Sequence, residues 1–197
     1  MEQWGHVRKL MSDKKLLPFF DCAYQGFASG NAPLDAAAIR MFVEDGHHLD
    51  VVQSFSKNFG LYGDRVGALS VVTGNEKEAQ SVLSQLKIVI RPSYSNPPRY
   101  GSQIVSVILS DPKMTTDFID QCAAMASRIG TMCHQLRENL ETTAPDRSWS
   151  HITRQIGMFA YSGLTKEDCE ALRDKHHIYC TLDGRISMAG VTKGNVQ

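Results

Sequence analysis

The sequence SFSKNFGLYGDRVG, residues 54–67, lies between two apolar runs and indicates the fold class. The run at 49–52 predicts a buried strand, and a second apolar run covers 66–72. A polar loop rich in glycine therefore follows the end of a buried strand. Open α/β sheets bind their ligands at such positions.

Lys57 has the most distinctive chemistry in this loop. It stands between Phe55 and Phe59, so we expect partial desolvation, which makes an amine a better nucleophile at neutral pH. Arg65 and Ser54 can hold a phosphate through a guanidinium fork and a hydroxyl. An amine beside a phosphate clamp meets the requirements of a pyridoxal phosphate Schiff base. Taken alone, a loop lysine is more often a solvated surface residue, so this interpretation depends on the rest of the chain.

Length and composition exclude several classes of protein. With 197 residues and 42% hydrophobic side chains, the chain can bury a core in one large or two small domains. A formal net charge of zero argues against a nucleic-acid or anionic membrane partner, and no apolar run approaches a membrane span. Five cysteines without CxxC spacing favour reduced thiols in an intracellular protein, and the paired histidines lack metal-ligand spacing. We therefore expect a cytoplasmic protein without a metal.

The remaining pattern predicts an α/β part followed by a smaller α+β part. Helices are expected at 2–15, 34–45, 75–90, 101–109, 111–140 and 165–174, and strands at 16–20, 49–52, 66–72, 155–161, 176–180 and 185–189. The prolines of 91–98 predict an extended break, and residues 190–197 predict the start of a final helix.

Three further residues carry side chains that suit the same cofactor and its substrate. Asp21 follows an apolar run and can pair with a protonated pyridine nitrogen, and Tyr24 can hydrogen-bond a ring oxygen. Arg185 follows the hairpin signal at 183–184 and can hold a carboxylate by a bidentate pair. Taken singly, Asp21 is more often an edge residue of the sheet, and Arg185 is more often part of a surface ion pair. The spacing alone does not show that these groups converge.

Several long motifs together resemble the aspartate aminotransferases of the class I pyridoxal phosphate-dependent family. They are FFDCAYQGFASG (19–30), the lysine loop (54–67), RPSYSNPP (91–98), QIGMF (155–159) and DGRIS (183–187). They occur in the same order as in the family. The resemblance covers essentially the whole chain and corresponds to the C-terminal half of the family's fold. It implies part of the fold-type I large domain, with an incomplete mixed or parallel sheet, in residues 1–120. It also implies an α+β small domain in residues 121–197 that begins with a long linking helix and is truncated at its C-terminal helix.

The resemblance implies a role for each residue around the cofactor. Lys57 would form the internal aldimine with pyridoxal phosphate and then shuttle the proton between substrate and cofactor. Asp21 would partner the pyridine nitrogen and Tyr24 the ring oxygen. Ser54 and Arg65 would hold the phosphate.

The resemblance also implies how substrate is bound. Arg185 would grip the α-carboxylate, with Phe159 nearby. Arg91 would select dicarboxylates by reaching into the site of the neighbouring subunit. The implied protein is a homodimer with a shared active site, and its reaction converts L-aspartate and 2-oxoglutarate into oxaloacetate and L-glutamate.

Two other hypotheses stay open. An aromatic amino-acid aminotransferase can share both arginines. The family's N-terminal half, which supplies further phosphate ligands and the aromatic ring that stacks on the cofactor, has no counterpart in these residues. The chain can therefore be a fragment, a partial gene model or an isoform that only associates with other subunits. A targeting peptide would belong to the missing half, so mitochondrial and plastid locations stay open beside the cytoplasm.

Overall fold

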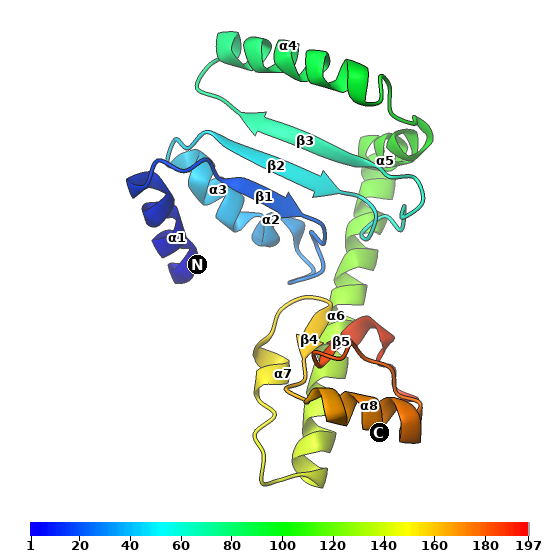
Figure 1. Ribbon diagram of the computed structural model, residues 1–197. Helices are drawn as coiled ribbons and strands as arrows, with labels where there is room; N and C mark the ends of the chain where they lie inside the picture. Colours follow the sequence, from blue (N-terminus) through cyan, green and yellow to red (C-terminus); the bar gives the residue numbers. More distant parts are fainter. Residues whose placement is uncertain (197) are drawn as a thin grey trace. The chain divides into compact units, whose positions relative to one another are not determined.

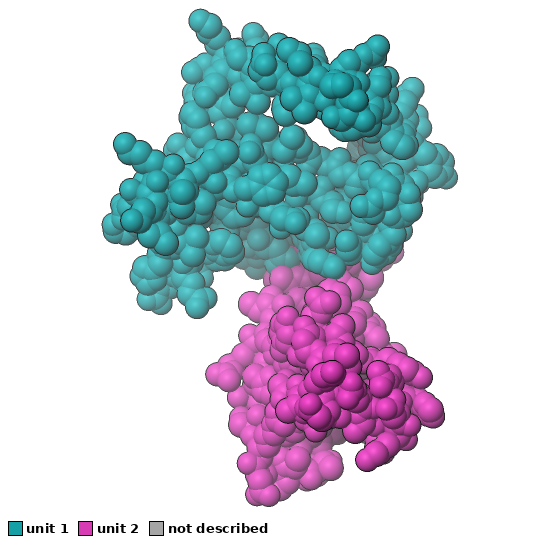
Figure 2. Space-filling view, viewed as in Figure 1, with its two compact units in different colours: residues 1–25, 32–119 teal, residues 26–31, 120–197 magenta. Residues whose placement is uncertain are grey.

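The computed structural model describes residues 1–196, which form two compact units (Figures 1 and 2). Unit 1 comprises residues 1–25 and 32–119, and unit 2 comprises residues 26–31 and 120–197. The helices of unit 1 are α1 (Glu2–Asp13), α2 (Ala32–Asp35), α3 (Ala37–Glu44), α4 (Glu76–Ser93) and α5 (Tyr100–Ser110), and its strands are β1 (Phe19–Cys22), β2 (Leu49–Ser54) and β3 (Gly67–Val72). Helix α6 (Pro112–Thr143) belongs to unit 1 up to Ile119. The elements that complete unit 2 are α7 (His151–Arg154), β4 (Phe159–Tyr161), α8 (Lys166–His176), β5 (Arg185–Ser187) and the 3-10 turn η1 (Met188–Gly190).

Unit 1 is built on a three-stranded sheet in the order β1-β2-β3. Strand β2 pairs in parallel with β1 and antiparallel with β3. The tight approach at the start of β3 requires a glycine, because a Cβ on Gly67 would lie 2.6 Å from the carbonyl oxygen of Gln53. Because it has one parallel and one antiparallel strand pair, the sheet is mixed, and it is small, as expected for an incomplete α/β sheet. Its outer strands, β1 and β3, each have one edge without a partner strand among the described residues.

The core of unit 1 lies between the sheet and α3. Phe42 of α3 and Leu49 of β2 are fully buried, and the ring of Phe20 meets that of Phe42 edge-on, with centroids 5.2 Å apart. Aromatic pairs of this geometry stabilise beyond their buried area. This packing fixes β1 and β2 side by side and so positions the loops that follow them.

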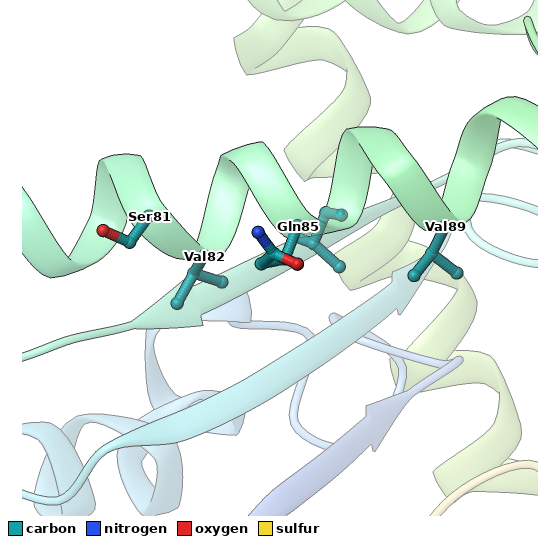
Figure 3. A pocket seen from close by; sticks show the side chains of 5 residues that line it. Ser81, Val82, Gln85 and Val89 are labelled. Carbon is teal, nitrogen blue, oxygen red and sulfur yellow. The ribbon is translucent and has the colours of Figure 1, made fainter.

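Helix α4 differs from α3, because none of its described residues is buried. It runs alongside β3 (Figures 1 and 3). An open groove of about 310 Å³ lies along it, lined by Ser81, Val82, Gln85, Leu86 and Val89. Apolar side chains on one helical face normally pack against another element. Here that face is exposed, with Val89 at 63%.

Unit 2 has its own hydrophobic core. It is formed by Ile129, Met132, Cys133, Trp149, Ile152, Ala160 and Met188. The antiparallel pair β4–β5 contributes to this core through Ala160, which pairs with Ile186. Arg128 of α6 donates to the backbone carbonyls of Ala189 and Val191, both at 3.0 Å. Helix, strands and the segment after β5 are thus tied together within unit 2.

The structure corrects the predicted break at the first prolines. Residues 91–93 are not extended, because they form the last turn of α4 with Pro92 inside the helix. Proline lacks the N–H that would reach the carbonyl of Ile88. Ile88 is 61% exposed, so water can satisfy that carbonyl and the helix continues.

Three predicted elements of unit 2 are also wrong, one in part and two entirely. The strand expected at 155–161 covers only Phe159–Tyr161, since Gly157 has a φ of +99°. No strand forms at 176–180, because α8 extends to His176 and His177 is left-handed, with a φ of +55°. Residues 191–196 contain no α-helix, and Gln197 lies outside the described residues.

In unit 1, strand β1 begins at Phe19 rather than at Leu16, and it contains Asp21.

Candidate active site

One edge of the unit 1 sheet gathers the ends of all three strands. Because β1 and β2 are parallel, Cys22 and Gln53 are partners near the carboxyl ends of both strands. Because β3 runs the other way, its first residue, Gly67, pairs with Ser54 at the same edge. Asp21, Tyr24, the lysine loop and Arg65 therefore come from this single edge.

Lys57 lies in the turn that follows β2 and is half-buried. The carbonyl of Lys57 accepts a hydrogen bond from the N–H of Gly60 at 3.2 Å, which closes the turn. Its Nζ lies 5.4 Å from the ring centroid of Tyr24 and 5.7 Å from that of Tyr62. These are cation–π distances. The amine is thus directed toward two tyrosines, one of which follows β1.

The phenylalanines on either side of Lys57 form a separate cluster. Phe55 and Phe59 meet edge-on with centroids 5.4 Å apart, and Phe59 stacks on Phe118 of α6 at 4.2 Å. This cluster joins the loop to the first part of α6, inside unit 1. It holds the backbone on which Lys57 stands.

The two predicted phosphate ligands occupy the two ends of the loop. The hydroxyl oxygen of Ser54 accepts a hydrogen bond from the N–H of Ser56 at 3.2 Å, and Ser56 is buried. Arg65 is exposed, has a φ of +51°, and donates from Nη1 to the carbonyl of Tyr62 at 3.1 Å. A left-handed conformation at an arginine is uncommon, and such strain collects at functional sites.

Gln25 is a residue of this site that the sequence patterns did not identify. Its Oε1 accepts hydrogen bonds from the side chains of Gln53 at 2.5 Å and Cys22 at 3.6 Å. Its backbone carbonyl accepts from Nδ2 of Asn58 at 3.5 Å, next to Lys57. Gln25 therefore connects the ends of β1 and β2 with the lysine loop. The only available signal was its position one residue after Tyr24.

Arg185 and Phe159 lie in unit 2. They come from the paired strands β5 and β4, and the guanidinium carbon of Arg185 lies 5.2 Å from the ring centroid of Phe159. The N–H of Arg185 donates to Oδ1 of Asp183 at 3.3 Å. The Thr181 hydroxyl and this N–H hold the pKa of the Asp183 carboxyl below its ordinary value. The charged head of Arg185 is exposed and supported by an aromatic face, an arrangement that suits a carboxylate ligand.

Arg91 occupies the last turn of α4 and is exposed. Its Nη1 donates to the Ser95 hydroxyl at 2.9 Å. This contact orients the guanidinium at the end of the helix. Within residues 1–196, the Arg91 side chain thus bonds to a residue close in sequence rather than to another candidate site residue.

The side chains at the unit 1 edge form a donor set that fits pyridoxal phosphate. The edge offers an amine, a carboxylate, a phenol, a hydroxyl and a guanidinium, which match the aldehyde, the pyridine nitrogen, the ring oxygen and the phosphate. Among residues 1–196, no three His, Cys, Asp or Glu side chains are grouped to hold a metal ion. The helices described in the chain include none long and apolar enough to cross a membrane.

The fold is that of the fold-type I aminotransferases. The family model for aminotransferase class I and II matches residues 1–197, and the chain belongs to this family. The chain is 53% identical over 195 residues to the mitochondrial aspartate aminotransferase of Arabidopsis thaliana, covering 99% of this chain and 45% of the relative. It is 52% identical over 192 residues to the cytoplasmic aspartate aminotransferase of Oryza sativa subsp. japonica, covering 98% of this chain and 47% of the relative.

Solved structures agree with the fold. A mitochondrial aspartate aminotransferase from Trypanosoma brucei superposes with a TM-score of 0.95 at 45% identity, covering 99% of this chain and 51% of that one. An aromatic-amino-acid aminotransferase from Burkholderia pseudomallei, covalently bound to pyridoxal phosphate, gives a TM-score of 0.96 at 42% identity and covers 99% and 49%. The chain thus spans about half the length of the proteins it matches.

Proposed function

We propose that this chain is the C-terminal half of an aspartate aminotransferase, which converts L-aspartate and 2-oxoglutarate into oxaloacetate and L-glutamate. The observation that carries the proposal is the meeting of Lys57, Asp21, Tyr24, Ser54 and Arg65 at one edge of the sheet. Identity of 53% to a curated aspartate aminotransferase supports the choice of substrate.

Bound pyridoxal phosphate would supply an electron sink for the carbanion formed at the substrate α-carbon. Lys57 holds the cofactor through its amine and moves the proton at that carbon. Asp21 keeps the pyridine nitrogen protonated, because a carboxylate beside a cation favours the charged form. Tyr24 donates to the ring oxygen. Ser54 and Arg65 bind the phosphate by hydrogen bonds and charge.

Substrate recognition falls to the arginines. Arg185 binds the α-carboxylate by a bidentate pair and is kept in place by Phe159. Arg91 binds the second carboxylate in the site of a partner subunit, so the functional protein is a homodimer. The exposure of Arg91 supports this role, since a residue that acts in another subunit must be accessible. We place the protein in the cytoplasm, although its relatives include mitochondrial, cytoplasmic and chloroplastic forms.

The half-reaction tests this proposal on the chain itself. Pyridoxal phosphate should produce a visible absorption band that the variant Lys57→Ala lacks. Addition of L-aspartate should convert that band to the absorption of the aminated cofactor, and Arg185→Ala should slow the conversion without removing the band. A chain that forms the band but never responds to aspartate does not perform the proposed reaction.

Aromatic amino-acid transamination is a second candidate. It is favoured by the similarity to the Burkholderia pseudomallei enzyme, whose name assigns it to aromatic amino acids. Comparison of L-aspartate and L-phenylalanine in the half-reaction separates the two. If L-phenylalanine converts the cofactor faster than L-aspartate does, the assigned substrate becomes an aromatic amino acid.

A non-catalytic role in association is the third candidate. Within residues 1–196, two sheet edges lack a partner strand and the apolar face of α4 is exposed, which favours this role because such surfaces in a folded protein are usually covered. The occupant that fits is a chain carrying the other half of the family's fold, since this chain covers 51% of a solved relative with a TM-score of 0.95. Co-purification with a full-length subunit, without any half-reaction, would favour this role.

A further inference from the structure

Tyr62 is an aromatic side chain that the proposed reaction does not use. It lies in the loop between β2 and β3 and is 56% exposed. Its ring centroid lies 5.7 Å from Nζ of Lys57, within the distance at which the face of an aromatic ring attracts an ammonium group. An exposed ring is thus in contact with the half-buried lysine of the candidate site.

The backbone of the loop brings this ring back to the lysine. Tyr62 follows Lys57 by five residues, which would separate them by about 17 Å in an extended chain. The hydrogen bond from the N–H of Gly60 to the carbonyl of Lys57 closes a turn between them. Gly60 supplies the left-handed conformation there, with a φ of +68°. The turn therefore directs the ring of Tyr62 toward the amine.

The residues after Tyr62 fix its backbone from the other side. Nη1 of Arg65 donates to the carbonyl of Tyr62 at 3.1 Å, and Arg65 itself is left-handed. A hydrogen bond from a charged donor is stronger than one between neutral groups. Tyr62 is therefore held between the turn at Gly60 and the guanidinium of Arg65.

A second ring approaches the same amine from another element. The ring centroid of Tyr24, which follows β1, lies 5.4 Å from Nζ of Lys57. The two phenylalanines that flank Lys57 in the sequence form their own cluster with Phe118. Two tyrosine rings, one after β1 and one after β2, are therefore within cation–π distance of the amine.

We propose that Tyr62 is a positioning residue, whose ring face together with that of Tyr24 holds the Lys57 amine at the edge of the sheet. The inference rests on the proposed function, in which Lys57 is the lysine that binds the cofactor. A lysine side chain has a flexible four-carbon stem and spreads over many rotamers, and each contact with Nζ restricts that spread. The ring face makes the contact, so the hydroxyl of Tyr62 is not needed for it.

Two substitutions at Tyr62 separate the ring from the rest of the side chain. Tyr62→Phe keeps the ring and removes the hydroxyl, whereas Tyr62→Leu keeps an apolar side chain and removes the ring. Because Tyr62 is exposed, neither substitution leaves a buried cavity. Tyr100→Leu is the matched control, since Tyr100 also belongs to unit 1 and is 70% exposed.

The first measurement locates the amine in the chain without cofactor. The lysines would be reductively methylated with isotopically labelled formaldehyde and observed by NMR, with Lys57→Arg identifying the Lys57 signal. Methylated ammonium groups keep their attraction to aromatic rings, and ring currents shift methyl groups above a ring face upfield. The Lys57 signal should be shifted upfield in the unchanged chain, in Tyr62→Phe and in Tyr100→Leu, and it should lose part of this shift in Tyr62→Leu. An unmoved signal in Tyr62→Leu would overturn the proposal, as would an equal loss in Tyr62→Phe.

The second measurement is the rate at which pyridoxal phosphate attaches to Lys57, trapped with borohydride and mapped by mass spectrometry. Tyr62→Leu should slow attachment about threefold, because losing one exposed cation–π contact lowers the population of the correctly placed amine by about that factor. Tyr62→Phe and Tyr100→Leu should attach at the rate of the unchanged chain. Equal rates for Tyr62→Leu and the unchanged chain would contradict the positioning role. The NMR measurement requires no cofactor, so a chain that shows the upfield signal but never attaches pyridoxal phosphate fails the proposed function and not the ring contact.

Discussion

Among the single side chains, Arg65 combines an uncommon backbone conformation with an expected role. Its φ of +51° places it where L-residues pay a conformational cost. We attribute this left-handed conformation to the need for the Arg65 guanidinium to face a ligand at the sheet edge. A lysine at this position would have the same charge and backbone preference but no bidentate fork.

Arg65→Lys should weaken the binding of pyridoxal phosphate about 30-fold, since a lost charge-assisted hydrogen bond costs roughly 2 kcal/mol. Binding of pyridoxal, which lacks the phosphate, should not change. Titration of the variant with both compounds measures the difference. Equal losses for the two would show that Arg65 supports the loop and does not bind phosphate.

The candidate residues of the sheet edge could be named from the sequence because the motifs that carry them are long and specific. Lys57, Asp21 and Tyr24 stand in motifs with many constrained positions. Gln25 stands in the same motif as Asp21 and Tyr24, but its importance could not be identified from the sequence, because it depends on hydrogen bonds from Gln53 and Asn58. These partners lie 28 and 33 residues away in the chain.

Among the helices and strands, α8 has an N-terminal capping box whose effect on stability can be measured. The hydroxyl oxygen of Thr165 accepts from the N–H of Asp168, and the Asp168 carboxylate accepts from the N–H of Thr165. The backbone N–H of Thr165 and, after it, the Thr165 side chain hold the pKa of the Asp168 carboxyl below its ordinary value of 3.8. Stability from this carboxylate is therefore fully present above 3.8 and is lost as the pH falls through the lower, folded pKa.

Thr165→Ala should destabilise unit 2 by about 1 kcal/mol near neutral pH, because it removes the N-cap hydroxyl. The stability difference between Asp168→Asn and the unchanged chain should be smaller in acid than at neutral pH, since the unchanged chain loses its carboxylate there. Urea unfolding at both pH values measures this. A stability difference that grows in acid would contradict this sign.

The aromatic cluster of the lysine loop leads to a prediction for α6. Phe118→Ala should cost about 1 kcal/mol of stability, since it removes the stacked partner of Phe59. It should also weaken cofactor binding, because the cluster anchors the loop. Ile119→Ala is the matched control, since Ile119 is the next residue and is 46% exposed. Equal effects of both variants on cofactor binding would remove the anchoring role.

The secondary structure was predictable where side chains act locally. Asn75, where the expected helix begins, caps α4 by accepting a hydrogen bond from the N–H of Glu78. The end of α8 was not predictable, because His177 adopts a left-handed conformation more typical of glycine. A break in the helix was predicted at Pro92, but Pro92 lies inside α4. The helix tolerates it because a proline in a last, exposed turn costs less than one in the middle of a helix.

For the whole chain, the most important observation is the fraction of its relatives' length that it matches. The sequence predicted the C-terminal half of the family's fold, and the relatives are covered to between 44% and 47%. A mixed sheet of three strands with two open edges is the structural counterpart within the described residues. The exposed apolar face of α4 also agrees with an incomplete fold.

Association with the other half of the family's fold should depend on that face. Val82→Asp together with Val89→Asp should weaken co-purification with a chain carrying the N-terminal half of a relative about tenfold or more, because charges would enter an apolar contact. The exposed substitution Lys77→Asp on the same helix is the control. Unchanged co-purification would place the contact elsewhere, such as at an open strand edge.

The most direct measurement of the central claim is the site of covalent cofactor attachment. The chain would be incubated with pyridoxal phosphate, reduced with borohydride and mapped by mass spectrometry. The account predicts one dominant modified lysine, Lys57, with the modification lost in Lys57→Ala and retained in Lys87→Ala, a variant in α4. Modification spread over the exposed lysines, with Lys57 unmodified, would contradict it.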